Sequence, residues 1–203
     1  MSVFIMRHGE TDWNVDMRLQ GCTDIPLNEN GRSQIRQSAK TLSGFSVKID
    51  AIWTSSLGRA QESARIVAQE IGYNQENIVI ETEFREREFG EAEGLKVEEV
   101  HIRYPDGNYP GMETPSQAGN RAKKAFERCL ELNPGKNILI VAHGGIIKNL
   151  LWALTGGTIR YRGNGILDNG GILRLEPKEG GYDIYQYVPA MAEFEKLADK
   201  DKA

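Results

Sequence analysis

The chain has 203 residues, of which 39% are hydrophobic and 27% charged, and its formal net charge is -4. This length and composition predict a single globular domain over residues 1–203 and exclude a small disulfide scaffold. The negative charge disfavours a nucleic-acid surface, and no apolar run approaches the roughly 18 residues of a membrane span. The two cysteines lack metal-ligand spacing, so we expect free thiols in a cytoplasmic protein that binds neither nucleic acid nor membrane.

Short apolar runs alternate with longer amphipathic stretches, which is the pattern of helices layered on a largely parallel sheet. The apolar runs suit central strands that are buried on both faces. Strands are predicted at residues 2–6, 50–54, 77–81 and 137–142. Helices are predicted at residues 29–43, 57–71, 116–132 and 144–156.

The C-terminal part is predicted to differ from this pattern. Residues 170–188 have the pattern of a hairpin that closes one edge of the sheet. We expect residues 189–203 to form a short amphipathic helix that frays into a charged tail. Earlier in the chain, residues 103–115 hold enough proline and glycine for a long loop, either the rim of a site or a segment anchored by its tyrosines.

Polar residues follow three of the predicted strands at the point where each strand ends. Arg7-His8-Gly9 follow the first strand, residues 54–64 include the end of the second, and residues 142–145 that of the fourth. Ligands of parallel α/β sheets lie beyond the carboxyl ends of the strands, so we expect these segments to share one site. His8 and His143 both stand after an apolar strand and before glycine, which favours a functional pair over two structural histidines.

Arg59 stands in the first turn of its predicted helix, where the positive end of the helix dipole disfavours a cation. This position indicates an anion nearby. The guanidinium groups of Arg7 and Arg59 have the fork geometry that matches phosphate oxygens. The alternative is that Arg59 extends to solvent or pairs with an acidic neighbour.

A metal site is the main rival use of two histidines and a carboxylate. It fits poorly because Arg7 beside His8 would repel a cation, and because no H-E-x-x-H or cysteine-ligand spacing occurs. We therefore expect no metal. His101 lies in a predicted helix without the context of the other histidines, so we expect a structural or solvent-facing role. Cys22 is expected, at most, in the wall of the site.

A proton donor is also needed, and the acidic run at residues 83–94 offers several. The sequence alone does not separate its glutamates, and a charge run is more often a solvated face. The candidates are Glu83, Glu86, Glu88, Glu91 and Glu93.

Five motifs together resemble the histidine phosphatase superfamily, which includes cofactor-dependent phosphoglycerate mutases and many small-molecule phosphatases. They occur in family order over at least residues 3–155. The resemblance implies a phosphoglycerate mutase-like α/β fold, a three-layer sandwich whose mainly parallel central sheet has helices on both faces. The motifs are RHGETDWN, LQGCTDIPLNENG, TSSLGRAQESA, FREREFGEAEG and VAHGG.

The resemblance also implies residue roles. His8 would be the nucleophile that accepts the phosphoryl group, Glu86 the general acid, and Arg7, Arg59 and His143 further catalytic groups. No cofactor or metal is implied. The residues that would bind the phosphate are Arg7, Asn14, Gln20, Gly21, Arg59, His143 and Gly144. Two departures from the family pattern, Phe84 and Ala92, leave the pocket shape near Glu86 open.

The function that these features favour is a phosphomonoesterase for a small phosphorylated metabolite. A mutase is the alternative, but mutases of the family carry a long insertion with adjacent arginines between the general acid and the second histidine, and this chain has no such pair. A non-catalytic phosphate-binding module is the alternative of another class. The oligomeric state stays open, with a homodimer as one option.

Overall fold

The computed structural model describes residues 1–45, 47–157 and 167–197. Strand bounds within these ranges are Val3–Arg7 (β1), Ala51–Thr54 (β2), Val79–Ile80 (β3), Ile138–Ala142 (β4), Ile172–Lys178 (β5), Gly181–Val188 (β6) and Glu193–Lys196 (β7). These strands form one seven-stranded sheet in the order β3-β2-β4-β1-β5-β6-β7. Strands β3, β2, β4 and β1 run parallel, and each later strand in that order runs antiparallel to its neighbour.

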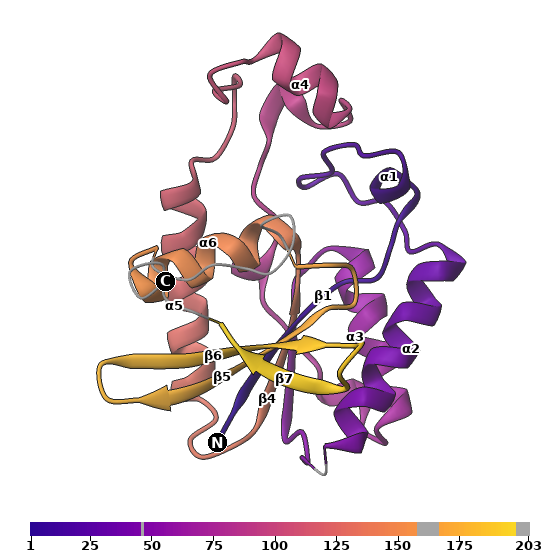
Figure 1. The fold of residues 1–203 in the computed structure, drawn as a ribbon, viewed down its shortest axis with the longest axis vertical. Coiled ribbons are helices and arrows are strands. Elements are labelled where there is room, and N and C mark those ends of the chain that lie inside the picture. The colour runs from indigo at the N-terminus through magenta and orange to yellow at the C-terminus, as the bar shows by residue number, and fades with distance from the viewer. Residues whose placement is uncertain (46, 158–166, 198–203) are drawn as a thin grey trace.

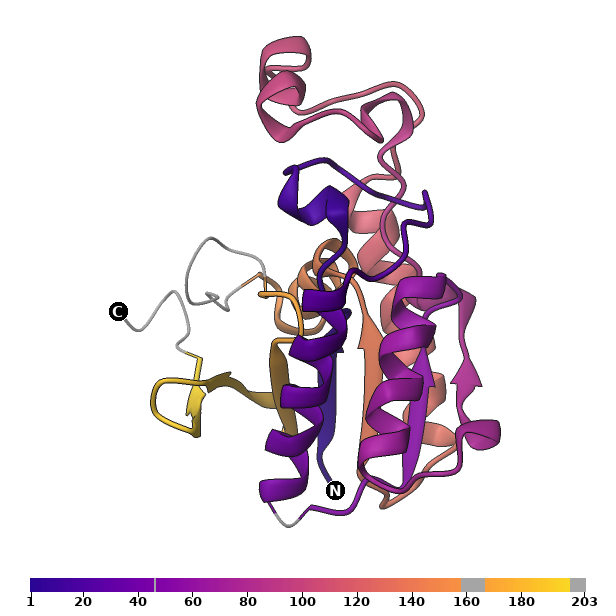
Figure 2. The ribbon, with the colours of Figure 1, turned by 90° about the vertical axis from the view of Figure 1, so that its right-hand side faces the viewer.

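Helices cover both faces of this sheet, with α2 and α3 on one side and α5 and α6 on the other (Figure 1, Figure 2). Alternate residues of β1 divide between the two faces: Phe4 and Met6 pack with α2 and α3, whereas Val3 and Ile5 pack with α5 and α6. The bounds of these helices are Glu29–Gly44 (α2), Gly58–Glu70 (α3), Pro115–Glu131 (α5) and Gly144–Thr155 (α6). The predicted three-layer α/β sandwich with a parallel core is confirmed.

Local signals explain why the four long helices begin and end within one residue of their predicted bounds. Asn28 caps α2 by accepting a hydrogen bond from the backbone of Gly31. Thr114 and Gln117 form a capping box at the start of α5, and Pro115 occupies its first turn. Helix α6 ends at Gly156, whose φ of +64° suits glycine.

The predicted central strand at residues 77–81 is wrong in extent and place. Strand β3 has two residues, pairs only with β2 and lies at the edge of the sheet. Its Val79 and Ile80 are 39% and 54% exposed. A short apolar run looks the same at the edge and at the centre of a sheet, so periodicity could not separate the two.

The predicted C-terminal helix is also wrong where the structure describes it, because residues 193–196 form β7. Phe194 packs in this strand against the rings of Phe4, Phe45 and Tyr187, and these contacts outweigh the local helical pattern. The predicted hairpin is confirmed as β5 and β6, but β7 rather than the hairpin forms the sheet edge. Residues 198–203 lie outside the described ranges, and the single domain over residues 1–203 stays a prediction.

A long connection between β3 and α5 extends past the carboxyl ends of the parallel strands. It holds helix α4, Val97–Arg103, which lies near the short helix α1, Asp12–Val15, at the top of Figure 1. Exposed His101 lies in α4, as expected. The predicted loop at residues 103–115 follows this helix, and its role as a rim stays a prediction.

Candidate active site

The ends of the parallel strands place the main predicted site residues together. β1 ends at Arg7 and β4 at Ala142, which are paired in register, and His8 and His143 follow them. Arg59 comes from the first turn of α3, shortly after β2. His8, Arg59 and His143 are 3%, 1% and 0% exposed. The centroids of the two imidazole rings are 5.1 Å apart, so these side chains form one buried cluster.

The imidazole of His8 has one defined hydrogen-bonded orientation. Its Nδ1 lies 2.7 Å from the carbonyl oxygen of Gly9. Since a carbonyl only accepts hydrogen bonds, Nδ1 of the neutral ring carries the proton and Nε2 keeps its lone pair. Burial lowers the pKa of His8 well below its ordinary value, and the charges of Arg59 and Arg7 lower it further. His8 is therefore neutral at pH 7, and its Nε2 is suited to nucleophilic attack.

Two guanidinium groups give the cluster its positive charge. Arg59 donates from Nη1 to the carbonyl oxygen of Thr23 at 2.8 Å and from Nη2 to that of Gly21 at 2.7 Å. Arg7 donates from Nη1 to the carbonyl oxygen of Leu167 at 2.7 Å. Burial is the largest influence on the pKa of both arginines and lowers it, but a guanidinium stays charged in proteins.

His143 stands at the N-cap of α6, and its Nε2 lies 2.7 Å from Oγ of Ser55. Burial lowers the pKa of His143 well below its ordinary value, followed by the charge of Arg59. Among the described residues, three buried nitrogens of the cluster lack a hydrogen-bond partner: Nδ1 of His143, Nε of Arg7 and Nε of Arg59. Unpaired buried nitrogens around two cations are the arrangement that an anion would complete.

Glu86 lies against the N-terminus of α6. Its Oε2 accepts a hydrogen bond from the backbone N–H of Gly145 at 2.9 Å, and its Oε1 accepts from those of Ile146 at 2.7 Å and Arg87 at 2.8 Å. A Cβ at position 145 would lie 2.7 Å from Oε1, so glycine there leaves room for the carboxyl group. Glu86 is the candidate from residues 83–94 that these contacts place beside His143.

The remaining predicted phosphate-binding residues differ in what the structure shows for them. Gly144 begins α6, and Gly21 contributes through the carbonyl oxygen that holds Arg59. Asn169 donates from Nδ2 both to Oδ1 of Asn14 and to the carbonyl oxygen of His8, at 3.2 and 3.1 Å. Asn14 is therefore linked to His8 through a third residue.

Gln20 is 7% exposed, and its Oε1 has no hydrogen-bond partner in the described part of the chain. Its contact with phosphate stays a prediction, as do the catalytic roles of the whole cluster.

Glu93 supports the segment that holds Arg59. Its Oε1 accepts a hydrogen bond from the N–H of Cys22 at 3.0 Å, and its Oε2 accepts one from the N–H of Thr23 at 3.1 Å. Gly21 has a φ of +53°, and a Cβ there would overlap the Glu93 carboxylate. The carbonyl oxygens that orient Arg59 are thus fixed by a glutamate more than thirty positions further along the chain.

A family model gives the cluster its context. The model of the histidine phosphatase superfamily (branch 1) matches residues 3–188. The chain belongs to this superfamily. Uncharacterized phosphatase PhoE of Bacillus subtilis (strain 168) is 42% identical to this histidine phosphatase over 156 residues, which cover 77% of this chain and 78% of that protein.

Two further comparisons agree with this assignment. Probable phosphoglycerate mutase GpmB of Cronobacter sakazakii (strain ATCC BAA-894) is 34% identical over 168 residues, covering 77% of this chain and 75% of that protein. Among solved structures, Bacillus stearothermophilus YhfR matches with a TM-score of 0.78 and 28% identity, covering 90% of this chain and 94% of that one. The likenesses therefore include proteins named as a phosphatase and as a mutase.

Cys22 lies in the wall of the site, as expected. Its Sγ donates a hydrogen bond to the carbonyl oxygen of Glu86 at 3.5 Å. Burial, followed by the charge of Glu93, raises the pKa of this thiol. Cys22 of the histidine phosphatase is thus protonated at pH 7, which disfavours its use as a nucleophile.

Arg121, from α5, holds the backbone around Glu86. It donates from Nη1 to the carbonyl oxygens of Glu83 and Arg85, and from Nη2 to that of Glu86, at 2.6, 3.0 and 3.0 Å. Its Nε and Nη2 also bind both carboxylate oxygens of Glu113 at 2.6 and 2.8 Å. One guanidinium therefore connects the Glu86 segment to the end of the loop at residues 103–115.

Sequence reasoning missed Ser55, Arg121 and Glu113. Ser55 could have been found, because it directly follows a predicted strand, as His8 and His143 do. Arg121 and Glu113 carry no local signal, since most of the groups that Arg121 binds lie far from it in the sequence.

Replacing Arg121 by alanine is expected to lower kcat about 10-fold, because a loosened backbone misplaces Glu86. The free energy of unfolding is expected to fall by about 3 kcal/mol, since Glu113 loses its partner in a largely buried ion pair. Steady-state kinetics with an alkyl phosphate and urea unfolding measure the two effects. Lys123→Ala on the same helix is the matched control, expected to change stability by less than about 0.5 kcal/mol. An unchanged kcat in Arg121→Ala would contradict the positioning role.

The buried histidines predict a stability that falls at acidic pH. The pKa values of His8 and His143 are lower in the folded than in the unfolded chain, where a histidine titrates near about 6.5. Below that pH the unfolded chain binds more protons. The free energy of unfolding should therefore be maximal above it and fall between about pH 6.5 and 5, by up to about 1.4 kcal/mol per pH unit for each histidine.

Urea unfolding at a series of pH values checks this expectation. His143→Asn should remove about half of the slope, whereas His101→Asn, at an exposed position, should leave it unchanged. Equal slopes in all three proteins would show that the buried rings take up protons in the folded state.

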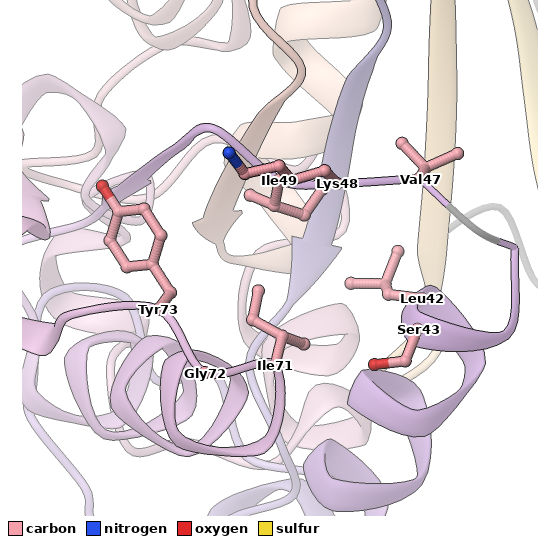
Figure 3. A pocket seen from close by; sticks show the side chains of 8 residues that line it. All are labelled: Leu42, Ser43, Val47, Lys48, Ile49, Ile71, Gly72 and Tyr73. Carbon is pink, nitrogen blue, oxygen red and sulfur yellow. The ribbon is translucent and has the colours of Figure 1, made fainter.

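Other parts of the structure do not point to a competing site. The pocket in Figure 3, of about 310 Å³, lies between the C-terminal ends of α2 and α3 and contains none of the predicted site residues. Within the described ranges, no group of three or more His, Cys, Asp or Glu residues could hold a metal ion. No helix in those ranges is long and apolar enough to cross a membrane.

Proposed function

We propose that this histidine phosphatase is a phosphomonoesterase that hydrolyses small phosphorylated metabolites through a phosphohistidine on His8. The observation that carries the proposal is the neutral His8 ring, whose Nε2 is free for attack because Nδ1 donates to Gly9. Two buried guanidinium groups and three nitrogens without partners surround it and supply the electrostatics for a phosphoryl group.

The reaction has two steps, and the same groups act in both. His8 Nε2 attacks phosphorus, the bond between phosphorus and the ester oxygen breaks, and protonated Glu86 gives its proton to the leaving alkoxide. Glu86 then takes a proton from water, whose oxygen attacks phosphorus. The P–N bond breaks, inorganic phosphate leaves, and neutral His8 and protonated Glu86 are restored. Arg7, Arg59 and His143 stabilise the charge on the phosphoryl oxygens in both steps.

Hydrolysis is favoured over phosphoglycerate mutase activity by the segment between Glu86 and His143. It contains no adjacent arginine pair that could bind a substrate carboxylate. Two of its arginines are already occupied: Arg121 binds Glu113, and Arg87 donates from Nε to the carbonyl oxygen of Glu113 at 2.7 Å. The likeness to a protein named as a phosphatase is also higher than that to the named mutase.

A non-catalytic phosphate-binding module is disfavoured because no residue of the reaction is replaced. His8, Arg59, Glu86 and His143 are all present and buried. Such a module would bind phosphate or vanadate and leave a generic aryl phosphate intact.

A panel of phosphorylated metabolites, assayed with a metal chelator present, tests the proposal. Sugar phosphates, phosphoglycerates, nucleotides and phosphoserine would be scored for phosphate release, and 2- and 3-phosphoglycerate interconversion would be followed in parallel. We expect release of inorganic phosphate from at least one class and slower or no interconversion. Faster interconversion would favour the mutase, and binding without turnover would favour the module. Cytoplasmic location and a homodimer stay predictions.

A further inference from the structure

Ser55 is a buried hydroxyl beside the site to which the proposed chemistry assigns no role. It directly follows β2 and is 0% exposed. Its backbone N–H donates to the carbonyl oxygen of Val141 at 3.0 Å, which holds it against β4. Its Oγ lies 2.7 Å from Nε2 of His143 and accepts a hydrogen bond from the N–H of Leu57 at 3.2 Å. The hydroxyl therefore has two neighbours, one of which can only donate.

Counting protons decides the direction of the hydrogen bond between Ser55 and His143. The hydroxyl has one proton to donate, and Leu57 already uses one of its lone pairs. If Nε2 of His143 also donated to Oγ, the hydroxyl proton would have no acceptor among the described residues. If the hydroxyl donates to Nε2, both atoms are satisfied. In a neutral imidazole, the proton then sits on Nδ1.

We propose that Ser55 is a positioning residue that fixes His143 in the Nδ1–H tautomer. Nδ1 is the buried nitrogen that lacks a protein partner, so this tautomer offers a phosphoryl oxygen an N–H donor. The opposite tautomer would offer a lone pair, which repels the same oxygen. This use of the donor rests on the proposed function, whereas the tautomer of the free protein does not.

The two histidines would then have complementary tasks with the same tautomer. Gly9 sets His8 as Nδ1–H and leaves the Nε2 lone pair for phosphorus. Ser55 sets His143 as Nδ1–H and directs a proton to an oxygen. A carbonyl and a hydroxyl thus select nucleophile and donor from one kind of side chain.

Nitrogen NMR of the protein labelled with ¹⁵N-histidine tests the tautomer directly. The chain has three histidines, so three ring systems are expected, and the His101→Gln and His8→Asn variants assign them. We expect both buried rings to show a protonated Nδ1 and an unprotonated Nε2 at pH 7.5. A protonated Nε2 on His143 of the unsubstituted protein would overturn the proposal without any variant.

Ser55→Ala tests the consequence. The His143 signals should move toward the Nε2–H tautomer while the His8 signals stay in place. We expect kcat/KM to fall about 10-fold and inhibition by vanadate to weaken by a similar factor, less than the full loss of one oxyanion donor. Ser55→Thr retains the hydroxyl and should recover tautomer and activity, and Ser56→Ala is the neighbouring control with neither effect. An unchanged tautomer and activity in folded Ser55→Ala would contradict the assignment.

These results separate the two proposals. Absence of turnover in the unsubstituted protein, with the Nδ1–H tautomer present on His143, would reject the proposed function alone. An active protein with Nε2–H on His143 would reject the role of Ser55 alone.

Discussion

Replacing His8 by alanine is expected to abolish phosphate release, with kcat falling by roughly 10⁴-fold or more, the scale for loss of a covalent nucleophile. No other side chain in the cluster offers a neutral nitrogen with a free lone pair, since Ser55 occupies Nε2 of His143. The remaining arginines would still bind phosphate, so vanadate affinity should fall far less than kcat. Phosphate release from an aryl phosphate and vanadate titration measure the two effects.

His101→Ala is the matched control for this substitution. It removes an exposed histidine in α4 and should leave kcat unchanged. If His8→Ala kept turnover within about tenfold of the unsubstituted protein, the nucleophile would lie elsewhere.

Replacing Glu86 by glutamine is expected to separate the two steps of the reaction. The first step needs a proton only when the leaving group is a poor one, so 4-nitrophenyl phosphate should still phosphorylate His8 rapidly. The second step needs a base to take a proton from water. We therefore expect a burst of one nitrophenolate per active site, followed by turnover slower by about 10²- to 10⁴-fold. An alkyl phosphate should show no burst.

Stopped-flow absorbance with the aryl phosphate measures the burst, and Glu91→Gln, an exposed position in the same acidic run, is the control. A variant that slowed the burst and the steady state equally for both substrates would have lost binding or folding rather than proton transfer. Full activity on alkyl phosphates would assign the proton transfer to another group.

Most of the site can be located from the sequence because its residues stand at strand ends. The carboxyl ends of parallel strands meet at one edge of a sheet, so the strand pattern alone predicts that His8 and His143 lie together. Arg59 is indicated by its unfavourable place in a helix. The choice of Glu86 depends on the family resemblance, because the backbone N–H groups of α6 that single it out lie about sixty positions away.

The parts that could not be predicted depend on tertiary contacts. β7 forms because Phe194 joins an aromatic cluster, which no local pattern reports. Glu93 looks equivalent to Glu86 in the sequence, yet it braces the segment that orients Arg59. Arg121 looks like one of several cations on an amphipathic helix, and only the fold shows that it holds the Glu86 backbone. Long-range supports of this kind have no fixed spacing along the chain.

The measurement that tests the central claim most directly is identification of the phosphoenzyme. Glu86→Gln protein would be mixed with an aryl phosphate, quenched in base, and analysed by intact mass, peptide mapping and phosphorus NMR. We predict one phosphoryl group, stable in base and lost in acid, attached to Nε2 of His8 and absent when His8 is also replaced. A phosphoryl group on another residue or on Nδ1 of His8, or turnover with no phosphoenzyme, would contradict the mechanism.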